Sequence, residues 1–145
     1  MVIRHGILLA AACLALSGQV ADPAWDPLEK AYEALQAREY DAAIGLFQTA
    51  ANAAPGRASI HKDLAYAYLK TGQTEAARDQ FAQAMQLAPG DSHAALEYAF
   101  LCHETGKTAE ARRIFDRLRK QDDPATRATA EEAFQNIDRP LAEGI

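Results

Sequence analysis

Apolar and small side chains along most of this chain recur at intervals of three and four residues, which places them on one face of an α-helix. The clearest stretch runs from 58 to 89, where Gly72 separates two such faces and Pro89-Gly90 ends the second. This pattern predicts two amphipathic helices joined by a tight turn. Thr74 follows the turn directly, and its hydroxyl group is predicted to cap the second helix.

The helix pair occurs three times, and corresponding positions lie 34 residues apart. The repeated positions are small or aromatic: Ala31, Ala65 and Ala99; Ala43, Ala77 and Ala111; and Phe47, Phe81 and Phe115. A constant interval of this length is typical of stacked two-helix units. Small side chains let paired helices approach closely, and the phenylalanines fill the remaining space. We therefore expect all of these residues to be structural.

The middle unit resembles a tetratricopeptide repeat (TPR), whose pattern runs aromatic, Leu-Gly, Tyr, Ala, Phe, Pro. The matching residues are Leu64, Tyr68, Ala77, Phe81 and Pro89. His61 replaces the aromatic residue, and Ala65 replaces the glycine as another small residue. The resemblance implies an all-α fold, an α-solenoid of three helical hairpins with a C-terminal capping helix. It covers residues 25–138.

The predicted boundaries are 25–57, 58–91 and 92–123 for the hairpins, 124–138 for the capping helix and 139–145 for a tail. The first unit departs furthest from the pattern, because Arg38 stands where the others have a turn glycine. Thr108 is predicted to cap its helix as Thr74 does. Asp123 and Pro124 suit the start of the capping helix, and Pro140 is predicted to end it.

In this family the first helix of each hairpin lines a concave face, where ligands usually lie. The residues predicted on that face form an aromatic column flanked by leucines, with one lysine and one histidine: Leu28, Tyr32, Leu35, Lys62, Tyr66, Leu69, Leu96, Phe100 and His103. The resemblance implies a protein or peptide partner, and these side chains suit an amphipathic helix or an extended apolar segment. The alternative is that the aromatic residues pack against the next hairpin and contact no ligand.

An acidic C-terminal tail is a poor match for this surface. Family members that bind such tails hold the terminal carboxylate with Lys and Asn. Leu28 and Tyr32 occupy the positions in the first unit where that pair would stand. We therefore do not expect the carboxylate-binding function here.

Residues 1–21 differ in kind from the array. Arg4 and His5 precede the apolar stretch 6–16, and small and polar residues follow. This is the layout of a secretory signal peptide, with cleavage plausible after Ser17. The sequence therefore predicts an exported protein, which would be periplasmic in a Gram-negative bacterium. The alternative is a buried first helix of the array.

Two other organisations remain open. Cys13 follows two small residues as in a bacterial lipoprotein signal, although Ala10 stands where leucine is usual. A chain lipidated at Cys13 would be an outer-membrane lipoprotein scaffold. The chain could also be the N-terminal TPR part of a longer outer-membrane export or assembly protein, since such arrays often precede an export barrel.

Composition limits the partners further. The chain has 145 residues, 49% of them hydrophobic and 24% charged, with a net charge of −5. This balance fits one soluble domain and argues against nucleic-acid binding. No apolar stretch after residue 21 is long enough to span a membrane, so membrane contact is expected only through the signal peptide or a lipid anchor.

One helix carries a basic run, predicted to be a solvated face, with lipid headgroups as the alternative: Arg112, Arg113, Arg117, Arg119 and Lys120.

The sequence offers little that could perform chemistry. Cys102-His103 resembles the end of a haem-attachment motif, but Ala99 stands where its first cysteine should be. Neighbouring helical residues point about 100° apart, so Cys102 and His103 are not expected to act as a nucleophilic pair. His93, Cys102 and His103 lack zinc-ligand spacing. We expect Cys102 to be buried and unreactive, and we expect no catalytic activity, cofactor or metal.

Overall fold

The computed structural model describes residues 20–142. The described part contains seven α-helices and no strand. The helices are α1 (Trp25–Gln36), α2 (Tyr40–Ala53), α3 (Ala58–Lys70), α4 (Thr74–Leu87), α5 (Ser92–Glu104), α6 (Thr108–Leu118) and α7 (Pro124–Ala142). Among the described residues, no helix is both long enough and apolar enough to span a bilayer. The predicted signal peptide lies outside the described residues except for Val20 and Ala21, and so do Cys13 and the end of the tail.

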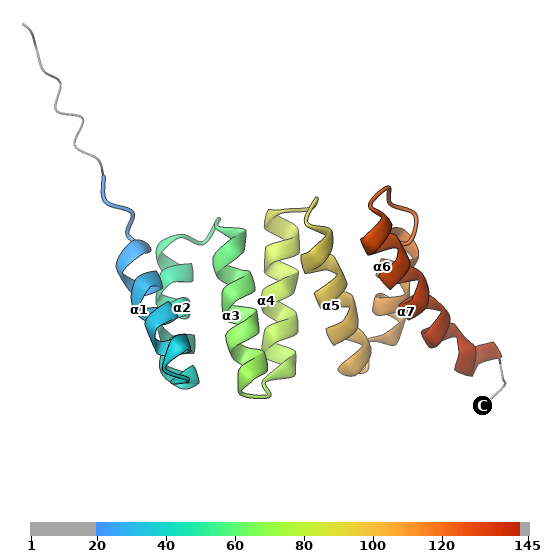
Figure 1. The fold of residues 1–145 in the computed structure, drawn as a ribbon, viewed down its shortest axis with the longest axis horizontal. Coiled ribbons are helices and arrows are strands. Elements are labelled where there is room, and N and C mark those ends of the chain that lie inside the picture. Colours follow the sequence, from blue (N-terminus) through green and yellow to red (C-terminus); the bar gives the residue numbers. More distant parts are fainter. Residues whose placement is uncertain (1–19, 143–145) are drawn as a thin grey trace, which may run out of the picture.

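The helices stand side by side in the order of the chain (Figure 1). α1 packs on α2, α3 on α4, and α5 on α6, and each hairpin also packs on the next through α2 with α3 and α4 with α5. α7 packs on α6 and also contacts α5, as the first helix of a fourth hairpin would. This arrangement confirms the predicted all-α solenoid of three hairpins and a terminal helix.

The repeated phenylalanines lie at the centre of the hairpins. Phe47 and Phe81 are 0% exposed and Phe115 is 1% exposed, and each belongs to a different buried cluster. The alanine columns around them are fully buried: Ala31, Ala65, Ala99, Ala43, Ala77 and Ala111. The structural role predicted for these columns is confirmed.

The turn inside each hairpin has the same geometry. In the second hairpin the N–H of Gly72 donates to the carbonyl of Leu69 at 3.2 Å, and the N–H of Gln73 donates to that of Tyr68 at 3.0 Å. This Schellman motif ends α3 and requires a left-handed backbone, with φ 72° at Gly72. Gln73 completes the motif and is also the residue that precedes α4.

The predicted threonine caps are wrong for this reason. Thr74 is already the first residue of α4, and the preceding Gln73 makes no side-chain capping bond. Thr108 is likewise the first residue of α6, after Lys107. A turn this short leaves the threonine one position too late for its hydroxyl to cap the helix.

Arg38 holds the left-handed position in the first hairpin, with φ 60°, where the other hairpins have glycine. A side chain with a Cβ atom is strained in this conformation, by roughly 1–2 kcal/mol. We therefore expect Arg38→Gly to raise the free energy of unfolding by about 1 kcal/mol, measured by chemical denaturation. Gly72→Ala, the reverse change at the equivalent position, should lower it by a similar amount. A destabilised Arg38→Gly variant would contradict this account of the turn.

The terminal helix begins as predicted but ends later. The carboxylate of Asp123 accepts the N–H of Thr126 at 2.8 Å, and Pro124 is the first helical residue. α7 then continues past Pro140 to Ala142, so the predicted end at 138 is too early. Proline lacks the N–H needed for one helical bond, which weakens the last turns without ending the helix there. The buried face of α7 joins the cluster of the third hairpin through Ala130, Ala133 and Ile137.

Candidate functional site

The aromatic column on the first helices remains accessible. Tyr32 is 43% exposed, Tyr66 37% and Phe100 43%. Each ring meets the buried phenylalanine of its own hairpin edge-on, with centroid distances of 5.3 Å for Tyr32–Phe47, 5.1 Å for Tyr66–Phe81 and 4.9 Å for Phe100–Phe115. The core thus fixes one side of each ring, and part of each ring remains exposed to solvent.

Tyrosine hydroxyl groups in this column reach the next hairpin. The hydroxyl of Tyr32 donates to Asp63 on α3 at 2.5 Å, and that of Tyr66 lies 3.5 Å from Nε2 of His93 on α5. Burial, followed by the bond to Asp63, raises the pKa of Tyr32 to about 12. The tyrosine hydroxyl groups therefore make interhairpin contacts of the kind that the packing alternative expects, whereas the predicted binding role of the rings stays a prediction. The hydroxyl groups join hairpins, while the rings stay accessible.

The predicted leucines lie deeper than the aromatic residues. They are half-buried and pack against the hairpin clusters: Leu28, Leu35, Leu69 and Leu96. None of them is among the exposed large hydrophobic residues of the described chain. The exposed apolar surface of the first helices is thus mostly aromatic.

The two polar positions of the predicted groove differ in their surroundings. Nζ of Lys62 lies 2.6 Å from a carboxylate oxygen of Asp91, whose other oxygen caps α5 by accepting the N–H of Ala94 at 3.0 Å. The hydrogen bond from Lys62 lowers the pKa of Asp91. Lys62 therefore joins the second and third hairpins. His103, in the last turn of α5, is exposed.

The first helices also carry a column of carboxylates that we did not predict. Its signal in the sequence is an acidic residue at every 34th position. Its members are Glu29, Asp63, Glu97 and Glu131. Asp63 accepts from Tyr32, and burial raises the pKa of this carboxyl. Phe100 has no hydroxyl group to continue the pattern, and Glu131 pairs with Arg119 at 3.1 Å. The first helices thus carry negative charge beside their aromatic rings.

A pocket of about 570 Å³ lies over α1 at the N-terminal end of the array. Its lining combines apolar and charged side chains: Asp22, Trp25, Leu28, Glu29, Tyr32, Glu33, Gln36 and Arg57. Trp25 is 67% exposed and was not among the residues predicted on the concave face. The sequence could have indicated this placement, because Trp25 lies seven residues before Tyr32 and so on the same face of a helix.

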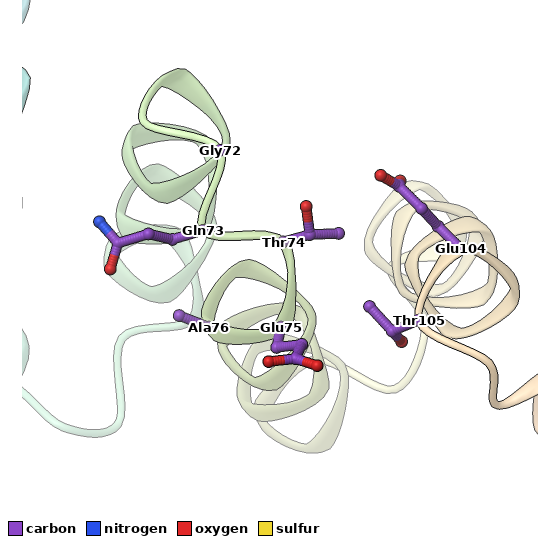
Figure 2. Close-up of a pocket in the computed structure, with 7 residues that line it drawn as sticks. All are labelled: Gly72, Gln73, Thr74, Glu75, Ala76, Glu104 and Thr105. Atoms are coloured by element: carbon purple, nitrogen blue, oxygen red, sulfur yellow. The ribbon is translucent and has the colours of Figure 1, made fainter.

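A second pocket, of about 420 Å³, lies between the α3–α4 turn and the end of α5 (Figure 2). Figure 2 shows the carboxylates of Glu75 and Glu104 pointing in different directions, so they do not converge on a common point. No group of three or more potential metal ligands occurs within residues 20–142. This pocket offers no arrangement typical of a catalytic or metal site.

Cys102 is buried, as predicted, and is 0% exposed. Burial raises the pKa of its thiol, which disfavours the reactive thiolate. His103, by contrast, is exposed, so these adjacent side chains lie in different environments. The geometry does not bring the two together as a nucleophile and a base.

The predicted basic run does not lie wholly on one helix, because α6 ends at Leu118 and Arg119 and Lys120 follow it. Much of the run is paired. Arg119 and Lys120 bind Asp116 at 2.8 and 2.7 Å, and Arg113 binds Glu110 at 2.6 Å. The guanidinium groups of Arg112 and Arg119 also lie over the ring of Phe134, 4.8 and 4.0 Å from its centroid. The ion pairs offset much of the positive charge, and the contacts with Phe134 join α7 to the third hairpin.

The fold is similar to several solved structures. The first TPR domain of Spaghetti (RPAP3), bound to an HSP90 peptide SRMEEVD, has a TM-score of 0.66 and 20% identity over 83% of this chain and 94% of that one. The TPR domain of Arabidopsis OM64 has a TM-score of 0.63 and 17% identity, over 81% and 95% of the two chains. The Sgt2 TPR domain from Aspergillus fumigatus has a TM-score of 0.62 and 19% identity, over 83% and 80%.

Similarity in sequence points the same way. No curated protein matches the chain. A family model described as tetratricopeptide repeat matches residues 34–84 and 72–130, which together span most of the three hairpins. With the repeated columns, the matching turns and the shared fold, this match shows that the chain belongs to the tetratricopeptide repeat family.

Proposed function

We propose that this protein is a non-catalytic scaffold that holds a helix or apolar segment of a partner protein on its concave face. The observation that carries the proposal is the aromatic column of Tyr32, Tyr66 and Phe100. Each ring is fixed by the core yet remains between 37% and 43% exposed. TPR domains act as protein–protein interaction scaffolds, and the RPAP3 domain is an example bound to a peptide.

The charge of this face favours a different ligand from an acidic tail. The helices that carry the aromatic residues also carry three carboxylates: Glu29, Asp63 and Glu97. Lys62 is already paired with Asp91. A peptide such as SRMEEVD would bring further carboxylates to this surface, where like charges repel. An apolar or basic segment suits it better.

We further propose that the protein acts outside the cytoplasm, in the periplasm if the source is a Gram-negative bacterium. The support is the sequence of the first 21 residues, with Arg4 and His5 before an apolar stretch. Cell fractionation tests export, and metabolic labelling with a fatty acid tests the lipoprotein alternative at Cys13. Recovery of the protein from the cytoplasm alone would contradict export.

Charge substitution on the aromatic column tests the binding proposal. We expect the double variant Tyr66→Glu/Phe100→Glu to lose partner capture from a native envelope extract, because it places charge where an apolar segment would pack. The matched control is Gln83→Glu/Ala109→Glu, which adds the same charge at exposed positions of the second helices. Helicity of both variants is checked by circular dichroism. Unchanged capture by a folded Tyr66→Glu/Phe100→Glu variant would remove the concave face as the binding surface.

A further inference from the structure

We propose that the pocket over α1 receives a basic side chain, Lys or Arg, from the segment that the partner lays along the concave face. This inference rests on the proposed peptide-binding function and names the chemistry of its ligand. The pocket lies at one end of the aromatic column, because Leu28 and Tyr32 belong to both. A segment following the column would therefore reach it.

The apolar walls of this pocket are held in place before any ligand arrives. The ring of Tyr32 is fixed at one side by Phe47, at 5.3 Å between centroids, and at its hydroxyl by Asp63, at 2.5 Å. Leu28, which also lines the pocket, packs on two buried clusters. Such a wall needs little reordering on binding, which lowers the cost of association.

Trp25, the first residue of α1, also lines the pocket. Its position follows from the turn before it, where its N–H donates to the carbonyl of Asp22 at 3.0 Å. The carboxylate of Asp22 accepts the N–H of Ala24 at 3.0 Å and binds Arg57 at 2.6 Å. Trp25 thus starts from a fixed turn but keeps 67% of its surface in solvent, where a ligand can cover it.

The charged residues around the pocket are predominantly acidic. Asp22, Glu29 and Glu33 contribute three carboxylates and Arg57 one guanidinium group, a net charge of −2. Arg57 is already paired with Asp22, and Lys30, which neighbours this face, pairs with Asp26 at 2.8 Å. Within the described part of the chain, neither Glu29 nor Glu33 forms an ion pair.

A cationic side chain matches this combination of walls and charges. Its aliphatic stem can lie on Leu28, its charged end is attracted by the faces of Trp25 and Tyr32, and its N–H groups can donate to Glu29 or Glu33. A neutral apolar side chain would pack against the apolar lining residues but would leave the carboxylates without a partner. An acidic side chain would be repelled.

Trp25 is the only tryptophan in the chain, so its fluorescence reports directly on this pocket. The probes are acetyl-Leu-Arg-Leu-amide and the same peptide with citrulline, which keeps the shape of arginine without its charge. Titrated into the full chain, the arginine peptide should change Trp25 emission and bind about fivefold or more tightly than the citrulline peptide. The difference should shrink as salt is added. Equal affinities, or no response to either peptide, would overturn the proposal.

Two double variants separate the pocket from general attraction to an acidic protein. Glu29→Gln/Glu33→Gln should remove the preference for arginine over citrulline. Asp122→Asn/Glu132→Gln removes the same charge at exposed positions away from the pocket and should keep the preference. Equal loss in both pairs would overturn the proposal. The proposed concave-face function fails separately, if a folded Tyr66→Glu/Phe100→Glu variant still captures its partner.

Discussion

Phe81→Ala should lower the free energy of unfolding by about 3–5 kcal/mol, measured by chemical denaturation followed by far-ultraviolet circular dichroism. Phe81 is 0% exposed and lies among buried alanines, which cannot extend to fill the space that its ring leaves. The ring contact with Tyr66, at 5.1 Å, is lost as well. A loss of this size is a large share of the stability of a small domain, which is typically about 5–15 kcal/mol.

The same substitution in the other hairpins tests whether the three modules are equivalent. Phe47 and Phe115 are as deeply buried, and each meets its own exposed ring. Phe47→Ala and Phe115→Ala should therefore destabilise the protein by similar amounts. Phe81→Leu is the conservative control and should cost much less, because it fills most of the volume. A loss below about 1 kcal/mol for Phe81→Ala would contradict the packing described here.

Ile137→Asp should destabilise the protein by about 3–5 kcal/mol, because the buried face of α7 is what covers the last hairpin. Ile137 is 6% exposed and belongs to the same cluster as Ile114 and Leu118. The substitution removes an apolar contact and places a carboxylate in that cluster. The measurement is again chemical denaturation.

The neighbouring position supplies a matched control for this substitution. Asn136→Asp introduces the same side chain at an exposed site on the same helix and should change stability by less than about 0.5 kcal/mol. If both variants were equally stable, α7 would not be the cover of the array. A selective loss for Ile137→Asp would establish that the terminal helix supports the hairpins.

The helical hairpins could be predicted because one physical requirement is repeated. Phe47, Phe81 and Phe115 each need a buried site, and the constant interval between them requires that site to recur in the same surroundings. The aromatic column was predictable for the same reason, since Tyr32, Tyr66 and Phe100 share that interval.

The predicted threonine caps were wrong because one residue in a short turn can belong to the end of one helix and the start of the next. Nothing in the residue types shows that Gln73 both completes the Schellman motif of α3 and precedes α4, and this displaced the expected cap from Thr74. Pro140 lies inside α7, although proline usually marks an end. The helical spacing that places Trp25 on the same face as Tyr32 could also have been recognised in the sequence. The first hairpin, however, departs furthest from the repeated pattern.

A photo-crosslinking amino acid placed at Tyr66 tests the central claim most directly, because the claim is that the aromatic column touches the partner. The same group placed at Gln83, exposed on the second helix of that hairpin, is the control. Irradiation of cells of the source organism should give one specific adduct from position 66 and none from position 83. Adducts from position 83 with none from position 66 would show that the partner binds elsewhere.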